Sequence, residues 1–384
     1  MKNPFEYGGI VSGKAFCNRK REIADLLRSA ENNEKLLIFS ERRMGKTSLV
    51  QVTLEKLAKK QYVTAYIDLW PTDGEASFIT TTAKSIIESM STTTEKLLST
   101  AKKFFSRLVP NLTVDDDGKP MIVFGVNKHI GAKPALEEVL NAPAKIAAKS
   151  RRKVVVVFDE FQQILEYGSD SVERRLRSII QKHANVSYFF LGSRKHLLQK
   201  LFLDKSRPLY RMAGHYPLRI IEEKYWLPFI RKRFLDAEKR ITDEQISSVC
   251  RLTQGHPFYT QHLCHALWEL CEVDNEVSGD LIEAAVQLLL DRENYAYSTL
   301  WETITLNQRR FLIGLAEATI EVKPFGSDFI QRYQLRSASN VQRSAESLLE
   351  RDVIDFDNGS YIVADRFFRI WIQRMQIIKE IPLT

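Results

Sequence analysis

The feature that most constrains the fold is a short apolar run, followed by a glycine-containing loop and then a helical pattern. Leu36-Leu37-Ile38-Phe39 has the continuous apolar character of a strand buried on both faces. The loop of residues 40–47 comes next, a helix is predicted over 47–60, and residues 62–67 indicate a second strand. Because two strands joined through a helix form a parallel pair with a right-handed crossover, this segment predicts an α/β domain.

Three further apolar segments, 154–158, 188–191 and 217–221, extend the predicted sheet. Five short strands that alternate with helical patterns are typical of a doubly wound α/β domain. Two alternating runs around an Asp-Gly turn at 115–118 predict an inserted β-hairpin over about 112–126. After a long helical region, three helices precede two strands joined by Asn358-Gly359, which is the order of a winged helix.

These patterns predict three domains: an α/β core over 1–221, a helical domain over 222–298 and a winged-helix domain over 299–384. The net charge of +8 is distributed unevenly, since residues 145–240 carry +12, residues 241–298 carry −8 and residues 299–384 are neutral. The basic excess is therefore local. This basic segment could form a nucleic-acid surface on the core, or it could contact the acidic helical domain or a second subunit.

Composition narrows the class of protein. With 384 residues, of which 44% are hydrophobic and 27% charged, the chain is an ordinary globular sequence. The four cysteines show no CxxC pairing, which favours reduced thiols. The sequence contains no run of about 18 apolar residues and begins without the apolar region of a signal peptide. We therefore expect a cytoplasmic protein with no membrane contact.

The loop after the first strand has the pattern of a phosphate-binding loop, GxxxxGK[ST], with Ser40 in place of the first glycine. In this pattern backbone N–H groups surround the phosphates, Lys46 reaches the β- and γ-phosphates and the Thr47 hydroxyl holds Mg²⁺. Glycine at the first position relaxes the backbone geometry of the opening turn, which serine reaches less easily. Ser40 therefore leaves two outcomes open: slower hydrolysis, or tight retention of ADP. The residues expected to bind ATP or ADP here are Ser40, Glu41, Arg42, Arg43, Met44, Gly45, Lys46, Thr47 and Ser48.

The strand over 154–158 ends in two carboxylates, Asp159 and Glu160. In a nucleotide site Asp159 holds Mg²⁺ and Glu160 orients and polarises the attacking water, which predicts hydrolysis of ATP rather than transfer of its phosphate. A solvated pair of strand-end carboxylates is the alternative. The next strand ends before Ser193, which we expect to sense the γ-phosphate, and either Arg194 or Arg211 would supply transition-state charge.

Several motifs occur in a fixed order along the chain: Phe16-x-Asn18-Arg19-x-x-Glu22, the loop, Phe158-Asp159-Glu160-Phe161, Gly192-Ser193, Gly255-His256-Pro257 and Asp365-x-Phe367-Phe368-x-x-Trp371. In this order they resemble the archaeal-type ATPase family, a branch of the AAA+/STAND ATPases related to origin-recognition initiators. The resemblance implies an AAA+ (ASCE) P-loop core with a parallel five-stranded sheet in the order 5-1-4-3-2, a helical lid and a C-terminal winged helix. It also implies nucleotide between core and lid, with Val11, Phe16, Arg19 and Pro257 beside the adenine.

We therefore expect an ATP-hydrolysing switch in which nucleotide state controls the core, lid and winged-helix arrangement and contacts with a protein partner or a second copy. The alternatives are an ATP-dependent DNA-binding initiator or mobile-element factor, and a nucleotide-dependent scaffold of a defence or signalling system with a separate effector. In the winged helix, Ser339 is the expected N-cap of a recognition helix, and the residues expected on its exposed face are Asn340, Gln342, Arg343 and Glu346. Zero net charge and an acidic wing at 355–357 favour protein contacts over DNA.

Overall fold

The computed structural model describes residues 2–90, 94–114, 120–126, 132–318, 323–357 and 359–380. The chain divides into two compact units. The first, here called the sheet unit, consists of Arg19–Arg42 and Lys46–Arg219. The second, here called the helical unit, consists of Met1–Asn18, Arg43–Gly45 and Ile220–Thr384.

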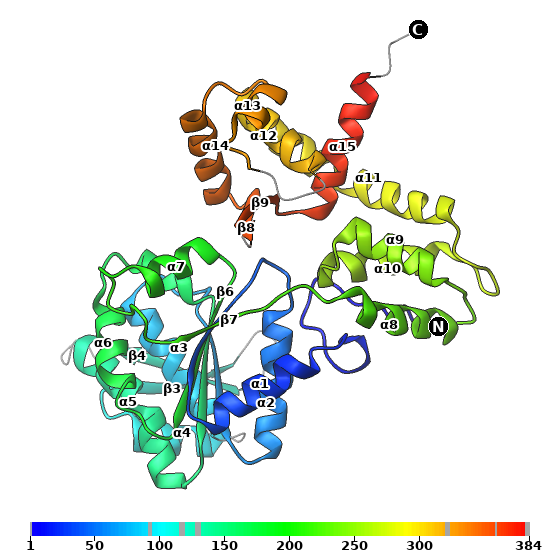
Figure 1. Cartoon of the computed structure of the whole chain (residues 1–384). Helices are drawn as coiled ribbons and strands as arrows, with labels where there is room; N and C mark the ends of the chain where they lie inside the picture. Colours follow the sequence, from blue (N-terminus) through cyan, green and yellow to red (C-terminus); the bar gives the residue numbers. More distant parts are fainter. Residues whose placement is uncertain are drawn as a thin grey trace. The chain divides into compact units, whose positions relative to one another are not determined.

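A five-stranded parallel sheet forms the centre of the sheet unit (Figure 1). Its strands are β1 (Lys35–Phe39), β2 (Val63–Asp68), β5 (Val154–Asp159), β6 (Val186–Gly192) and β7 (Gly214–Pro217), in the order β2-β5-β6-β1-β7. This is the order that the resemblance implies. Every residue of β5 and β6 is buried, as expected for inner strands of a parallel sheet covered on both faces.

Helices cover both faces of this sheet. In Figure 1, α1 (Lys20–Glu31) and α2 (Lys46–Lys59) lie on one side, whereas α5 (Ala132–Ser150) and α6 (Ser171–Ile180) lie on the other. The remaining helical elements of the sheet unit are α3 (Glu75–Glu88), α4 (Thr94–Phe104), the 3-10 helix η2 (Phe161–Tyr167) and α7 (Lys195–Leu203). Alternation of strands and helices therefore builds the layered α/β architecture that the sequence predicts.

The fifth strand differs from its predicted position. We expected residues 217–221, but β7 ends at Pro217. Among the described strands, β7 pairs only with β1, from Leu36 opposite Gly214 to Phe39 opposite Pro217. Because β1 ends at Phe39 and leads into the loop, β7 has no strand to pair with further along, and the apolar residues after Pro217 lie outside the sheet.

The predicted hairpin is present as β3 (Leu108–Val114) and β4 (Pro120–Val126), an antiparallel pair with Leu108 opposite Val126. Its first strand begins four residues before the predicted start at 112. Buried aromatic residues anchor it, since the Phe105 and Phe124 rings meet edge to face at 5.6 Å. The predicted turn at 115–118 lies outside the described residues.

The helical unit begins with the N-terminal segment, which contains the 3-10 helix η1 (Gly13–Ala15), and continues with α8 (Glu223–Leu235), α9 (Asp243–Thr253), α10 (Pro257–Leu270) and α11 (Gly279–Thr303). Phe5 is buried against Phe229 and Phe234, so the N-terminal segment packs on these helices. Helix α11 continues without a break through residue 298, where we expected a domain boundary. The boundaries at 221 and 298 stay predictions.

The last part of the chain has the expected order of three helices and two strands, and a further helix follows them. The elements are α12 (Leu306–Glu317), α13 (Ser327–Arg332), α14 (Ala338–Glu350), β8 (Ile354–Asp357), β9 (Ser360–Val363) and α15 (Arg366–Glu380). The N-cap of α14 is Ser337 and not Ser339, because Ser337 has extended backbone and its side chain accepts from the Asn340 N–H at 3.3 Å. Asn358, part of the predicted Asn-Gly turn, lies outside the described residues.

The four cysteines are buried and carry free thiols, as the sequence predicts. Burial raises the pKa of the Cys250 thiol to about 12, and it also raises the pKa of the Cys264 thiol. These two side chains are therefore protonated at neutral pH and act as small apolar groups. Among the described helices, none is both long enough and apolar enough to cross a membrane.

Candidate active site

The carboxyl ends of three neighbouring strands bring the predicted phosphate and catalytic residues to one edge of the sheet. In the parallel register Phe39 of β1 lies opposite Gly192 of β6, and Phe158 of β5 lies opposite Phe190 of β6. The residues that follow these strands therefore start from the same edge. Ligands bind at this edge in open α/β sheets because the loops after the strands converge there.

The loop after β1 leads directly into α2, whose first residue is Lys46. Gly45 has a φ of +80°, a conformation that glycine adopts without strain. The first N–H groups of a helix have no partner within the helix, so they and the loop amides suit an anion. Lys46 is buried, and its Nζ donates to the Ser40 Oγ at 3.0 Å and to the Glu41 carbonyl at 2.9 Å.

Ser40 occupies the first position of the loop without the positive φ that would favour glycine. It is not among the described residues with positive φ, so this position does not require glycine. Its hydroxyl donates to the Glu41 carbonyl at 2.9 Å and accepts from Lys46. Serine at this position therefore adds a side-chain contact that holds the loop lysine.

Asp159, at the end of β5, is 3% exposed and accepts from three groups. Its Oδ2 accepts from Thr47 Oγ1 at 2.8 Å and from the Tyr66 hydroxyl, and its Oδ1 accepts from the Glu160 N–H at 2.8 Å. Burial, and next the Asp159 charge, raise the pKa of Tyr66 well above its usual range, so its hydroxyl stays protonated.

The Thr47 and Asp159 oxygens fit a magnesium ion. Mg²⁺ prefers oxygen ligands and is usually bound through one or two protein groups together with phosphates and waters. A threonine hydroxyl and a carboxylate oxygen in contact provide this donor set. Within the described ranges there is no group of three or more His, Cys, Asp or Glu side chains that could hold a metal ion.

Glu160 follows Asp159 in the left-handed region, with a φ of 49°, at the N-cap of η2. This backbone conformation is uncommon for a residue other than glycine and is found often at functional sites. Two side chains donate to its carboxylate: Gln162 through Nε2, and Ser193 through Oγ at 3.2 Å. The structure thus brings Ser193 to Glu160, as expected for two neighbouring strand ends.

Gln162 is held closely by the end of β6. It is 4% exposed, and a Cβ on Gly192 would lie 2.2 Å from its Oε1. Real Cβ atoms do not approach other atoms so closely, so any larger residue at 192 would displace Gln162. Because Gln162 and Ser193 both contact Glu160, the glycine indirectly fixes the position of that carboxylate.

The other predicted residues have different surroundings. Arg194 is the N-cap residue of α7 and follows Ser193 directly, whereas Arg211 is exposed and its guanidinium lies 5.2 Å from the Tyr210 ring. In the loop, Arg42 is exposed, Met44 and Ser48 are buried, and the Arg43 guanidinium lies 4.3 Å from the Phe258 ring. The roles of Arg194 and Arg211 in the transition state stay predictions.

The predicted adenine-side residues divide between the two units. Val11, Phe16 and Pro257 belong to the helical unit, where Pro257 is the first residue of α10. Arg19 belongs to the sheet unit, is buried, and pairs with Glu22 at 2.8 Å. Their contacts with a base stay predictions.

Two side chains at the site were missed at the sequence level, Tyr66 and Gln162. Tyr66 lies in β2 opposite Val157 of β5, so its proximity to Asp159 depends on strand register that a single sequence does not reveal. Gln162 carries only a weak signal, since it is the first of two adjacent glutamines, Gln162 and Gln163, that follow Phe161. Only the structure shows that it turns back to that carboxylate.

The basic clusters of residues 145–240 form several contacts within their own units. Arg175 pairs with Glu137, Arg174 with Asp170 at 2.6 Å, and Arg231 with Asp243. Exposed pairs of this kind contribute about 0–1 kcal/mol each, so they leave the side chains available to a partner. Whether this surface contacts DNA, protein or a second copy stays a prediction.

Comparison with solved structures shows the fold. A Walker-type ATPase of Pyrococcus abyssi is 17% identical, with a TM-score of 0.64 over 96% of this chain and 99% of its own. The Aeropyrum pernix ORC2 protein, solved in ADPNP–ADP complexes, is 15% identical, with a TM-score of 0.53 over 98% of both chains. No curated protein matches.

Family models match two parts of the chain. One, described as a probable winged helix domain, matches residues 295–374, and the other, described as an ATPase domain predominantly from Archaea, matches residues 16–263. The second match spans well over half of the sequence and contains the loop, Asp159, Glu160 and Ser193. The chain is therefore a member of this predominantly archaeal ATPase family, with an AAA+ fold and a C-terminal winged-helix domain.

Proposed function

We propose that this ATPase binds and hydrolyses Mg²⁺-ATP at the cluster around Lys46, Thr47, Asp159 and Glu160, and that its nucleotide state controls domain arrangement and partner contacts. The observation that carries the proposal is the hydrogen-bonded connection from Thr47 through Asp159 to Glu160 and Ser193. These residues follow different strands and meet at one sheet edge. A chance loop motif or a solvated carboxylate pair would not produce this convergence.

Each residue has a role that follows from its chemistry. The Lys46 ammonium would exchange its loop acceptors for β- and γ-phosphate oxygens, while loop and helix N–H groups bind the other phosphate oxygens. Thr47 and Asp159 would hold Mg²⁺, which when bound neutralises phosphate charge. Tyr66 keeps the Asp159 carboxylate oriented by donating to the oxygen that also contacts Thr47.

Glu160 would position the attacking water and accept its proton. The water oxygen bonds to the γ-phosphorus, the bond from that phosphorus to the β,γ-bridging oxygen breaks, and ADP and phosphate leave. Gln162 and Ser193 would hold the Glu160 carboxylate at the angle this step requires. Ser193 lies between the end of β6 and the start of α7. Loss of the γ-phosphate would therefore alter the position of both Glu160 and α7.

The helical unit supports the switch part of the proposal. One hydrophobic cluster joins the N-terminal segment, helices α8 to α11 and the winged helix, with Phe5, Trp226, Leu289 and Phe368 among its members. Elements that share a packed core respond together, so a nucleotide-driven movement of α10 would carry the winged helix with it. A protein partner, or a second copy of the chain, would then read the position of this unit.

Hydrogen exchange on the full-length chain tests the switch. With Mg²⁺ and either ADP or a non-hydrolysable ATP analogue, we expect exchange in α10 and in the winged helix to differ between the two nucleotides. Lys46→Ala should lose both nucleotide binding and the difference. If calorimetry shows that both nucleotides bind and the exchange patterns of the helical unit are identical, the switch is wrong even though the ATPase assignment stands.

A further inference from the structure

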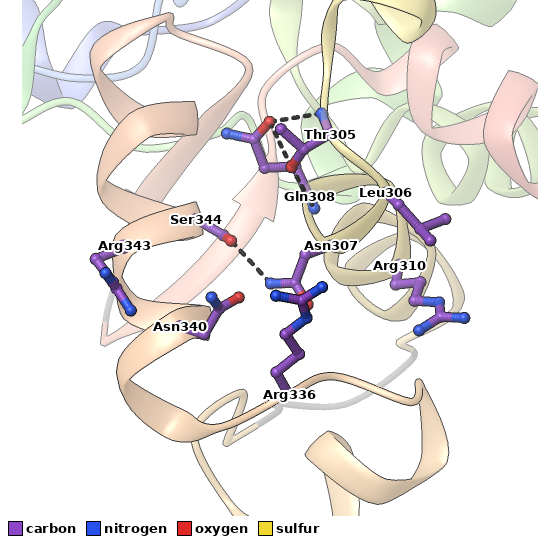
Figure 2. A pocket seen from close by; sticks show the side chains of 9 residues that line it. All are labelled: Thr305, Leu306, Asn307, Gln308, Arg310, Arg336, Asn340, Arg343 and Ser344. Carbon is purple, nitrogen blue, oxygen red and sulfur yellow. Dashed lines mark hydrogen bonds between the residues drawn. The ribbon is translucent and has the colours of Figure 1, made fainter.

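A groove separates the start of α12 from the first half of α14 in the winged helix (Figure 2). Its volume is about 460 Å³. Nine residues line it: Thr305, Leu306, Asn307, Gln308, Arg310, Arg336, Asn340, Arg343 and Ser344. None of the nine is acidic and three are arginines, so the groove is strongly basic although the domain that contains it has no net charge.

The three arginines approach the groove from different segments. Arg310 comes from α12, Arg336 from the turn before α14, and Arg343 from α14; Figure 2 shows Arg336 extending toward Asn307. Arg310 is fixed by donating to the Gln334 carbonyl at 2.7 Å. Arg336 and Arg343 are exposed, and across the described parts of the chain neither side chain has a hydrogen bond or an ion pair. Two guanidinium groups are thus available to a ligand.

The floor of the groove is rigid and polar. Asn307 Nδ2 donates to Ser344 Oγ at 3.0 Å, and Gln308 Nε2 donates to Ser347 Oγ at 3.2 Å, so two side-chain bonds tie α12 to α14. Both Gln308 and Ser344 are 7% exposed. These contacts set the distance between the helices, and therefore the spacing of the arginines, before any ligand arrives.

The start of α12 adds to the positive potential. Thr305 caps the helix, with its hydroxyl accepting from the Gln308 N–H at 3.3 Å. The N–H groups of Leu306 and Asn307, which precede that residue, form no hydrogen bond within the described ranges. Free first-turn amides and the helix dipole favour an anion, and here they reinforce an arginine cluster that is basic without them.

We propose that this groove binds the phosphodiester backbone of a nucleic acid. Arginine pairs with phosphate through two parallel hydrogen bonds, and three arginines spread over two helices and a turn suit successive phosphates better than one isolated charge. Leu306 is the only apolar residue in the lining and is 64% exposed, so an apolar peptide side chain would find no pocket there. Amides of Asn340 and Asn307 provide further contacts to phosphate and sugar.

The position of the arginines in the groove changes the conclusion about DNA that was drawn from the net charge of the winged-helix domain. Zero charge over residues 299–384 and the acidic wing favoured protein contacts at the sequence level. In the structure the basic groups gather in the groove, while Glu346 of α14 accepts from Gln342 at 3.0 Å and does not line it. Local charge, not domain charge, determines phosphate binding.

Fluorescence anisotropy with the full-length chain, a short labelled DNA duplex and a series of salt concentrations tests the proposal. Arg336→Gln/Arg343→Gln should weaken binding by at least about tenfold and should reduce the slope of log K against log salt by about two. The matched control is Arg332→Gln/Arg351→Gln, which removes two exposed arginines outside the groove and should change the affinity by less than about threefold. Lysine at 336 and 343 should restore much of the binding.

Several results would overturn it. Equal losses in the groove variant and its control, or no loss in either, would show that the groove is not the site. Absence of duplex binding, together with tripolyphosphate binding that the groove variant loses, would rule out a nucleic acid as the ligand. Thermal unfolding and ATP turnover equal to those of the unaltered chain would show that each variant is folded.

Discussion

Tyr66→Phe is the substitution that most sharply tests how Asp159, the carboxylate proposed to bind Mg²⁺, is held. It removes one hydroxyl and leaves the aromatic ring in β2. That hydroxyl donates to Asp159 Oδ2, and because burial and the Asp159 charge raise the pKa of Tyr66, it remains a donor throughout the neutral range. The change therefore deletes one hydrogen bond to a buried carboxylate without altering charge.

The expected magnitude follows from the contacts. A hydrogen bond to a charged group contributes about 1.5–3 kcal/mol. Thr47 still donates to the same oxygen, and Tyr66 is only partly buried, so we expect the free energy of unfolding to fall by about 1 kcal/mol. A less firmly oriented Asp159 should raise the Mg²⁺ concentration for half-maximal ATP turnover by about three- to tenfold, since 1.36 kcal/mol corresponds to a factor of ten.

Urea unfolding and a Mg²⁺ titration of ATP turnover give the two values. Tyr62→Phe is a matched control, because the Tyr62 hydroxyl has no hydrogen bond in the described part of the chain. A double-mutant cycle with Asp159→Asn isolates the pairwise energy and should show coupling of about 1 kcal/mol. Zero coupling, together with a Mg²⁺ dependence like that of the control, would refute the reasoning.

Two further predictions concern the second carboxylate and pH. Gly192→Ala places a Cβ against Gln162, so turnover should fall about tenfold or more while the Kd for ATP stays nearly constant; unchanged turnover would argue against a positioning role for Gln162. Burial, and next the Lys35 charge, lower the pKa of His183 to about 4. Below about pH 6.5 the native state therefore binds fewer protons than the unfolded state. The contribution of neutral His183 to the free energy of unfolding is fully present above that pH and is lost as the pH falls. Between pH 7 and pH 5 the loss should be about 1–2 kcal/mol, measured by urea unfolding, and His183→Asn should remove it; an equal loss in the variant would contradict this.

The sequence predicted the parts of the fold whose signals are local. Four apolar residues before a GKT loop indicate β1 and α2, and five apolar residues before Asp159 indicate β5, because inner parallel strands are buried on both faces. The end of β7 was misplaced, because an edge strand ends with its partner and its own apolar residues continue. The N-cap of α14 was misplaced by two residues, because several serines near a helix start offer similar caps.

The candidate site was predictable to a similar extent. Lys46, Thr47, Asp159 and Glu160 follow from loop and strand-end patterns, and Ser193 follows from the end of the next strand. Tyr66 depends on strand register, and Gln162 depends on a side chain that turns back to its neighbour. The arginine groove was hidden because net charge averages over a domain, whereas binding depends on which side chains meet.

The central claim is that Glu160 activates water for ATP hydrolysis at this site, and Glu160→Gln tests it most directly. The substitution keeps the size of the side chain and one oxygen that can still accept from Gln162 and Ser193, but it removes the base. We predict a Kd for Mg²⁺-ATP within about threefold of the unaltered chain and a single-turnover hydrolysis rate reduced by about 10²–10⁴-fold. A hydrolysis rate equal to that of the unaltered chain, with ATP bound, would contradict the account.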